Sequence, residues 1–420
     1  MSSPTTKEKI FSRYEVFVIA VLSILQFTVI LDFMVLSPLG AQLMKELSIT
    51  TGQFSLVVSA YAISAGISGL LAAGFADKFD RKKLLLFFYT GFVGGTFLCG
   101  IAPDYQFLLI ARIVTGIFGG VIGSISFAII TDLFKMEVRG RVMGFVQMAF
   151  ATSQVMGIPA GLYFANISDW HAPFIMIVGL SVVVGIIIII YLKPINKHLS
   201  IQSKTSPLAH FSSIVSQPKY LKGFAATTLL ATGGFMLMPF GSAFVVHNLG
   251  IAREKLFIIY MITGVFSMIS GPLIGKFSDK LGKYTMFVMG TVLSIVMVII
   301  YCNMGITPIW LVIVLNSIMF MGIMARMISS SALMTAVPEP KDRGAFMGIN
   351  SSVQQISGGI ASGIAGLIVV QQTKESPLEH YDTLAYVVTG TMIITMVLMY
   401  FINEFVVKNQ KPVEAVKAAA

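Results

Sequence analysis

The chain has 420 residues, of which 56% are hydrophobic and only 11% are charged, and its formal net charge is +10. A soluble chain carries about 25% charged residues, and 29 basic with 19 acidic residues cannot cover the surface of a soluble protein this long. The composition therefore excludes a soluble enzyme, a disordered chain and a disulfide-stapled secreted module. It indicates a protein whose surface faces lipid.

Apolar stretches long enough to cross a membrane recur along the chain. A membrane-spanning helix needs about 20 apolar residues. Reading for such runs predicts twelve helices, at about 15–40, 53–74, 84–102, 105–131, 141–166, 171–192, 220–246, 256–275, 284–303, 307–333, 344–370 and 383–406. The first run is longer than the apolar region of a signal peptide and is interrupted by Asp32, so we do not expect it to be cleaved.

Basic residues are distributed unequally between the predicted loops. If the N-terminus is cytoplasmic, 23 of the 29 lysine and arginine residues fall on the cytoplasmic side, four fall outside, and Arg112 and Arg326 lie within spans. Positive residues stay on the cytoplasmic side during insertion, so we expect both termini there. The basic charge is explained in this way without nucleic acid or another acidic partner.

The two halves of the chain repeat each other at a nearly constant offset. Pro38 matches Pro239 at an offset of 201, Cys99 matches Cys302 at 203, and the Arg-Gly pair that begins at Arg139 recurs at 204. A parallel repeat of six helices is typical of transporters with a site between two halves. We therefore predict a first half at 1–192, a cytoplasmic linker with three prolines at 193–219, a second half at 220–406 and a cytoplasmic tail at 407–420.

Several motifs resemble the major facilitator superfamily, over essentially the whole chain. The segment 74–83, Gly-Phe-Ala-Asp-Lys-Phe-Asp-Arg-Lys-Lys, is similar to the family signature between helices 2 and 3, although Ala73 and Asp80 stand where glycines are usual. Arg112 and the glycines after it resemble helix 4 of proton-coupled members, and 157–161 resembles the helix 5 signature of drug/proton antiporters. The resemblance implies an all-α membrane protein with twelve transmembrane helices in two six-helix halves, the major facilitator fold.

Two ionisable residues lie deep inside predicted spans. Asp32 is roughly 9 Å from the outer end of helix 1 at Pro38, and Arg112 is roughly 10 Å from the outer start of helix 4. Charged groups inside a membrane are costly and are functional by default. We expect a pair that forms and breaks with proton binding; a permanent pair that joins helix 1 to helix 4 is the alternative.

The cytoplasmic loops contain a candidate gate. Asp77 lies among basic residues, and by the resemblance it faces the start of helix 11, where backbone N–H groups favour a carboxylate. Arg81 is expected to pair with Asp132. The alternative is that the basic residues of this loop only set the orientation. The candidate gate residues are Asp77, Arg81, Asp132, Asp279, Arg139 and Arg343.

The substrate cavity is expected among polar, aromatic and methionine side chains of the helices that line it in the resembled fold. Arg326 lies roughly 28 Å from the outer start of helix 10, near the cytoplasmic edge. Its side chain either extends to the lipid headgroups or binds an anionic substrate. The candidates are Gln26, Met34, Tyr61, Gln147, Gln154, Phe235, Met236, Asn316, Arg326, Asn350 and Gln354.

These features favour a proton-coupled exporter of small amphipathic molecules, expected to be a monomer in the cell membrane. Its partners are then a small-molecule substrate, protons and the lipid bilayer. The alternatives are a specific carrier of a sugar or nucleoside, as exporter or proton symporter, and, more remotely, a non-transporting receptor on the same fold. The sequence contains no phosphate-binding loop, no nucleophile with its base and no Cys/His cluster, so we expect neither an enzyme nor a cofactor or metal.

Overall fold

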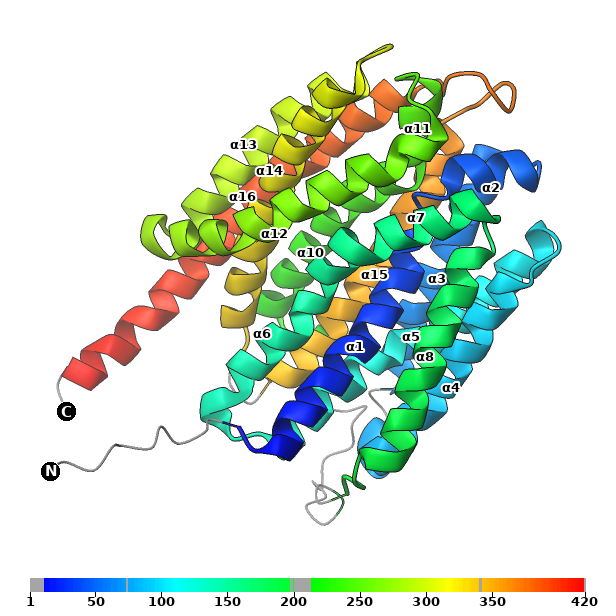
Figure 1. Cartoon of the computed structure of the whole chain (residues 1–420). Coiled ribbons are helices and arrows are strands. Elements are labelled where there is room, and N and C mark those ends of the chain that lie inside the picture. Colours follow the sequence, from blue (N-terminus) through cyan, green and yellow to red (C-terminus); the bar gives the residue numbers. More distant parts are fainter. Residues whose placement is uncertain (1–10, 73–74, 197–198, 200–212, 340–341, 419–420) are drawn as a thin grey trace, which may run out of the picture.

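The computed structural model describes residues 11–72, 75–196, 199, 213–339 and 342–418, with the backbone alone at positions 77, 136, 137, 140, 344 and 409–418. The described chain forms long helices, and strand-like pairing within it is limited to an isolated bridge between Val370 and Glu379. The start of α1 (Arg13–Val35) and the end of α16 (Tyr381–Ala418) lie at one end of the bundle (Figure 1). We call this the terminal end and the opposite one the outer end.

The helices fall into two sets of six crossings. The first half contains α1, α2 (Gly40–Glu46), α3 (Thr51–Ala72), α4 (Arg81–Gly100), α5 (Tyr105–Leu133), α6 (Met136–Thr152), α7 (Ile158–Ile167) and α8 (Ala172–Tyr191). The second half contains α10 (Pro218–Leu237), α11 (Gly241–His247), α12 (Leu256–Leu281), α13 (Lys283–Cys302), α14 (Ile309–Ala336), α15 (Arg343–Ile368) and α16.

Polar residues fix where several helices start. The Ser12 hydroxyl accepts from the backbone of Glu15, whose carboxylate accepts from the Ser12 backbone in return, so α1 begins with a complete capping box. Asp80 and Asp104 cap α4 and α5 by accepting backbone N–H groups three residues on. Each cap satisfies N–H groups that have no partner within the helix.

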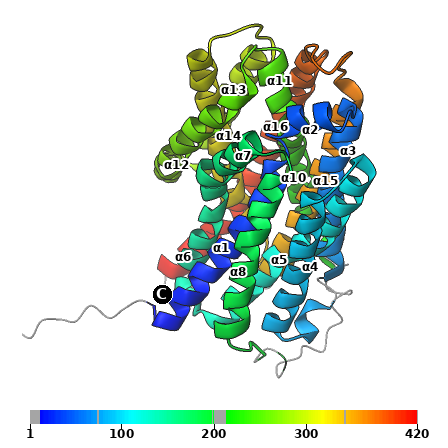
Figure 2. The same ribbon diagram turned by 45° about the vertical axis from the view of Figure 1, so that its right-hand side comes forward.

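Ten helices of the described residues are long and apolar enough to cross a membrane by length and composition. The remaining two crossings are α6 with α7, and α15, which run alongside the others (Figures 1 and 2). They are less apolar because polar side chains face other helices; α15 buries Asn350, Ser352 and Ser362 in the protein. The predicted fold class, twelve transmembrane helices in two six-helix halves, is therefore confirmed.

The fifth crossing is interrupted in the middle. A π-helical segment, Ser153–Gly157, joins α6 to α7. Pro159 follows directly, and because proline has no N–H, the carbonyl four residues earlier loses its normal helical donor. The wider π turn is a common response to such a break and often marks a functional position. On this segment Val155 and the Gln154 carbonyl lie against Gly264 of α12, in the other half.

The two halves are joined mainly at the outer end. Among the described residues, every hydrogen bond or ion pair between the halves links residues 37–55 to residues 238–253 or 362–375. Thr51 donates to the Val369 carbonyl over 2.7 Å, for example. One hydrophobic core spans both halves there, whereas each half has its own core toward the terminal end. The bundle is thus closed at its outer end.

Helices α3 and α15 form the longest contact between the halves and lie side by side in both views (Figures 1 and 2). Small residues permit this approach. A Cβ atom added at Gly359 would lie 2.6 Å from Ile63 Cγ1 and 3.1 Å from the Ser59 carbonyl oxygen. Glycine at such positions lets helices in a membrane pack backbone to backbone.

Several predicted helix ends are wrong. The first span ends at Val35 rather than at 40, because Pro38 disfavours a continuous helix. The seventh crossing, Pro218–His247, agrees with the predicted 220–246, although its α-helix is interrupted after Leu237 at Pro239. In contrast, α12 and α16 run beyond their predicted ends at 275 and 406, since charged residues outside the apolar core can keep helical hydrogen bonds. Most of the predicted linker at 193–219 lies outside the described residues, so the domain limits stay a prediction.

We predict that Gly359→Val destabilises the protein by about 1–3 kcal/mol, because the larger side chain overpacks the contact between α3 and α15. The matched control is Gly348→Val in the same helix, where an added Cβ meets nothing within 4 Å. Denaturant unfolding of the two purified variants measures the difference. Equal stability of both would mean that helix propensity, and not the contact, sets the effect.

Candidate functional site

The predicted partners Asp32 and Arg112 meet inside the first half. Arg112 Nη1 donates to Asp32 Oδ2 over 2.7 Å, and both side chains are fully buried. Thr96 of α4 donates to the other carboxylate oxygen over 3.0 Å. Three helices, α1, α4 and α5, therefore converge on one carboxylate. Such a charge-assisted network is stable in a low-dielectric interior because each charge has a close partner.

Arg112 is only partly satisfied by this network. Its Nε and Nη2 have no hydrogen-bond partner within the described chain. The guanidinium carbon lies 4.4 Å from the centre of the Tyr61 ring, so the face of the cation rests on an aromatic side chain of α3. The guanidinium is therefore held by one carboxylate and one ring, and two of its nitrogens stay unpaired within the described chain.

Aromatic rings continue from this pair into the other half. The Phe33 ring lies 5.3 Å from Tyr61 and 5.6 Å from Phe235 of α10, centre to centre. Phe235 packs in turn against Gly358 of α15. A chain of contacts thus runs from Arg112 through Tyr61 and Phe33 to Phe235, across the interface between the halves.

The second half holds an uncharged counterpart of this arrangement. Thr263 and Asn316 lie 202 and 204 residues after Tyr61 and Arg112, within the 201–204 range of offsets that the repeat shows. Asn316 Nδ2 donates to Thr263 Oγ1 over 3.2 Å, and both residues are buried. The repeat therefore preserves a contact between its second and fourth helices. It replaces the charges with neutral polar groups.

Arg326 is buried rather than extended to the membrane surface. Its side chain is 6% exposed, and its guanidinium carbon lies 5.8 Å from the centre of the Phe287 ring on α13. Nε and Nη2 have no hydrogen-bond partner among the described residues. The expectation that Arg326 reaches the headgroups is wrong, because the close approach of α13 to α14 at Gly290 encloses the residue.

The other cavity candidates are in different environments. Asn350 accepts from Thr227 Oγ1 over 2.6 Å, and Gln154 is buried with its amide oxygen unpartnered within the described chain. Gln147 and Gln354 are exposed. The remaining candidates pack in the interior: Met34 and Met236 are buried, and Gln26, partly buried, lies beside Gly123.

The gate residues are brought together only in the first half. Arg81 Nε donates to Asp132 Oδ2 over 3.0 Å, as predicted, and Arg81 also donates to the Ala76 carbonyl. The side chain of Asp77 lies outside the described residues.

The described contacts of the three remaining gate candidates do not link the two halves. Arg139 donates to the backbone of Phe134 and Thr131, Asp279 near the end of α12 pairs with Lys283 at the start of α13, and Arg343 is exposed. Among the described residues, no group of three or more His, Cys, Asp or Glu side chains could hold a metal ion.

Sequence reasoning missed two residues of the site, Phe33 and Thr96. Phe33 follows Asp32 directly, and Thr96 is one of many small polar residues in apolar runs. Neither position carries a signal in the sequence, because both roles depend on how the helices are rotated about their axes. The one available hint was that Phe33 directly follows the buried Asp32 within the same span.

Comparison with known proteins identifies the family that the sequence of this chain matches. A model of the Major Facilitator Superfamily matches residues 22–362 and 223–420. The uncharacterized MFS-type transporter YbcL of Bacillus subtilis (strain 168) is 23% identical over 84% of this chain and 88% of its own length. Multidrug resistance protein 3 of the same organism is 32% identical, over 35% of this chain and 28% of its own length.

A solved structure with a similar fold is a mutant of the nucleoside transporter NupG. Its TM-score to this chain is 0.72 at 16% sequence identity, over 92% of this chain and 99% of that one.

We predict that Arg112→Met costs about 3–5 kcal/mol of stability, because it leaves the Asp32 carboxylate buried without its counter-ion. Arg326→Met is the matched control and should be neutral or stabilising, since it removes a buried charge that has no counter-ion among the described residues. The double variant Asp32→Leu/Arg112→Met should be closer to wild type than Arg112→Met alone. Denaturant unfolding of the four proteins tests this. A double variant no more stable than Arg112→Met alone would contradict the pairing.

Proposed function

The chain belongs to the Major Facilitator Superfamily, and we propose that it is a proton-coupled exporter of small amphipathic molecules that works by alternating access. The observation that carries the proposal is the buried Asp32–Arg112 pair, whose contacts continue through Tyr61 and Phe33 into the second half. The protein acts as a monomer in the cell membrane, with both termini cytoplasmic. It requires no cofactor and catalyses no chemical reaction.

Protons act on the pair itself. Asp32 is the only fully buried carboxylate among the described residues. Proton binding neutralises it, while Arg112 keeps its charge. Arg112 then lacks a counter-ion and moves away from Asp32 toward an acceptor on the substrate. Because the two protonation states favour different positions of Arg112, they favour different arrangements of the halves.

Substrate enters from the terminal end, which is the cytoplasmic side in this proposal. The outer end is sealed by contacts between the halves, and Gln147 and Gln354 are exposed on α6 and α15. In this proposal the rings of Phe33, Tyr61 and Phe235, which pack in series between the halves, form the inner end of the substrate path. An aromatic surface of this kind suits amphipathic compounds with flat apolar parts.

The contact between Arg81 and Asp132 serves as one part of the cytoplasmic gate. It ties the start of α4 to the end of α5, and therefore holds the loop that contains Asp77 in place. From this position Asp77 reaches the N-terminal end of α15 when the halves close on the cytoplasmic side. The helix dipole there stabilises a carboxylate.

Export of a specific polar metabolite is the second candidate function. The buried amide oxygen of Gln154 and the buried contact between Asn316 and Thr263 favour it, since a sugar or nucleoside requires matched polar groups. A panel of sugars, nucleosides and drugs, added to proteoliposomes while proton flux is recorded, distinguishes the two candidates.

We predict that Asp32→Asn abolishes transport driven by a pH gradient and preserves binding of neutral substrates. Asparagine retains the size of the side chain and hydrogen bonding to Thr96, but it cannot take up or release a proton. Substrate binding and pH-driven flux are measured on the same purified protein. Normal pH-driven flux would remove Asp32 from the mechanism and leave it a structural anchor.

We predict that Phe33→Ala weakens the binding of aromatic drugs about tenfold, because it removes the ring between Tyr61 and Phe235. Ethidium and chloramphenicol serve as probes in equilibrium binding experiments. Phe97→Ala, which changes an exposed ring on α4, is the control. Unchanged affinity in both variants would place the drug site elsewhere.

A further inference from the structure

A long apolar groove runs along the outside of the first half. Its volume is about 810 Å³, and it is lined by α1, α6 and α8. Helix α1 lies between the other two and forms the floor (Figure 1). Phe145 and Met148 of α6 and Met156 of the π-helical segment are exposed although they lie in a membrane crossing. The groove therefore opens toward the hydrocarbon of the bilayer.

The walls of the groove offer no free polar group along its length. Its two hydroxyl groups are satisfied within their own helices, since Ser23 donates to the Ile19 carbonyl and Thr152 to the Met148 carbonyl. None of the described residues that line it is a carboxylate. The interior of the groove therefore suits an alkyl chain and is unfavourable for a polar solute.

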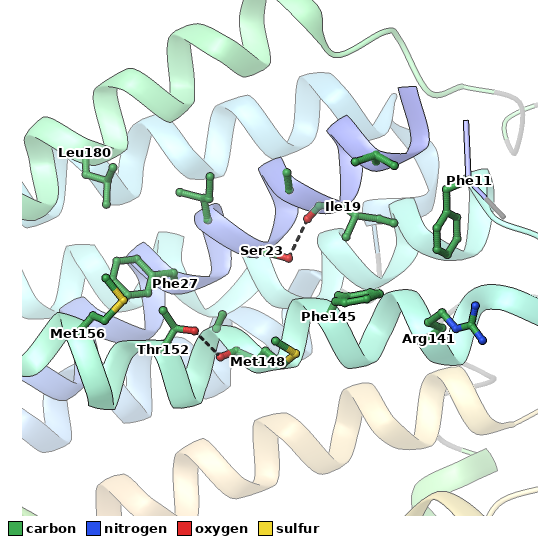
Figure 3. A pocket seen from close by; sticks show the side chains of 14 residues that line it. Phe11, Ile19, Ser23, Phe27, Arg141, Phe145, Met148, Thr152, Met156 and Leu180 are labelled. Atoms are coloured by element: carbon green, nitrogen blue, oxygen red, sulfur yellow. Dashed lines mark hydrogen bonds between the residues drawn. The ribbon is translucent and has the colours of Figure 1, made fainter. Parts of the chain in front are cut away.

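The terminal end of the groove contains a charged side chain, in contrast to the apolar interior. Figure 3 shows Phe11, Phe145 and Arg141 at one end and Phe27, Met156 and Leu180 at the other. Arg141 is exposed and has no hydrogen-bond or ion-pair partner within the described chain. An arginine fork at the mouth of an apolar groove binds a phosphate group in two-point geometry.

Among the described residues that line the groove, Arg141 is the one with a charged side chain. Arg13 starts α1, and the neighbouring Glu15 is engaged in the helix cap with Ser12. A headgroup whose phosphate is not balanced by an amine is therefore preferred over a zwitterionic one. Basic residues at a membrane surface also attract anionic lipids by their charge.

We propose that this groove binds one anionic phospholipid, with its phosphate on Arg141 and one acyl chain along α1 toward Phe27 and Met156. The chain ends beside the π-helical segment that contacts Gly264 of the second half. A bound lipid thus supports the fifth crossing from outside, at the level where its inner face meets α12. The lipid binds as a structural partner and is not transported.

The test uses the full-length protein and two variants that separate headgroup from chain. Arg141→Gln removes the cation, and Ala20→Trp fills the floor of the groove from an exposed position of α1. Lys222→Gln and Val292→Trp are the matched controls, as an exposed cation and an exposed lipid-facing position of the second half. Native mass spectrometry counts retained phosphatidylglycerol. Thermal unfolding is followed in nanodiscs of phosphatidylcholine with and without phosphatidylglycerol.

We expect the wild type and both controls to retain one phosphatidylglycerol and to unfold at a higher temperature when it is present. Arg141→Gln should bind it at least about tenfold more weakly, and Ala20→Trp should lose it. The proposal is overturned if the wild type shows no preference for phosphatidylglycerol, or if the controls lose it equally. It is also overturned if ethidium displaces the lipid, because the groove would then be a substrate entrance.

Discussion

The ion pair between Asp32 and Arg112 is the constraint around which the first half is built. Two charges can remain inside a membrane protein only if they are close together and shielded from lipid. The surrounding helices meet this condition through small residues. A Cβ at Gly119 would lie 2.8 Å from the Tyr61 hydroxyl, so this glycine allows α3 to approach α5. Tyr61 then covers the face of Arg112. The glycines after Arg112 in the sequence thus have a direct physical role.

Duplication explains much of the architecture but not its chemistry. Both halves join their second and fourth helices by a buried contact, with Arg112 on Tyr61 in the first and Asn316 on Thr263 in the second. Only the first half adds a carboxylate, since Gly233 stands at the repeat position of Asp32. Duplication therefore accounts for two similar halves, while the proposed proton coupling depends on an acid in only one of them.

The sequence determines the fold class and the pairing of Asp32 with Arg112, because apolar length, loop charge and depth along a helix can all be read from residue spacing. It does not determine helix rotation. For this reason Phe33 and Thr96 were missed. For the same reason the side chain of Arg326 was expected to extend to the membrane surface, whereas it is enclosed beside Phe287. Helix ends near prolines and the π-helical segment depend on local backbone competition, which hydropathy does not report.

The seal at the outer end consists of contacts that are weak one by one. Hydroxyl groups of Thr51 and Ser242 donate to single carbonyls of the opposite half, and such bonds contribute about 0.5–1.5 kcal/mol each. The ion pair between Lys45 and Glu375 is exposed and adds little. The Lys45 ammonium holds the pKa of Glu375 below its ordinary value, so this pair stays charged throughout the neutral pH range.

A change of proton concentration near neutrality therefore does not break this ion pair. The proposed mechanism instead requires two arrangements of the halves that are close in free energy, so that a change at one buried group shifts their populations. A charge pair in a low-dielectric interior can supply several kcal/mol between its two protonation states, more than any single contact of the seal. The proposed coupling group thus lies at the buried pair, and the weak outer contacts are what allow it to act.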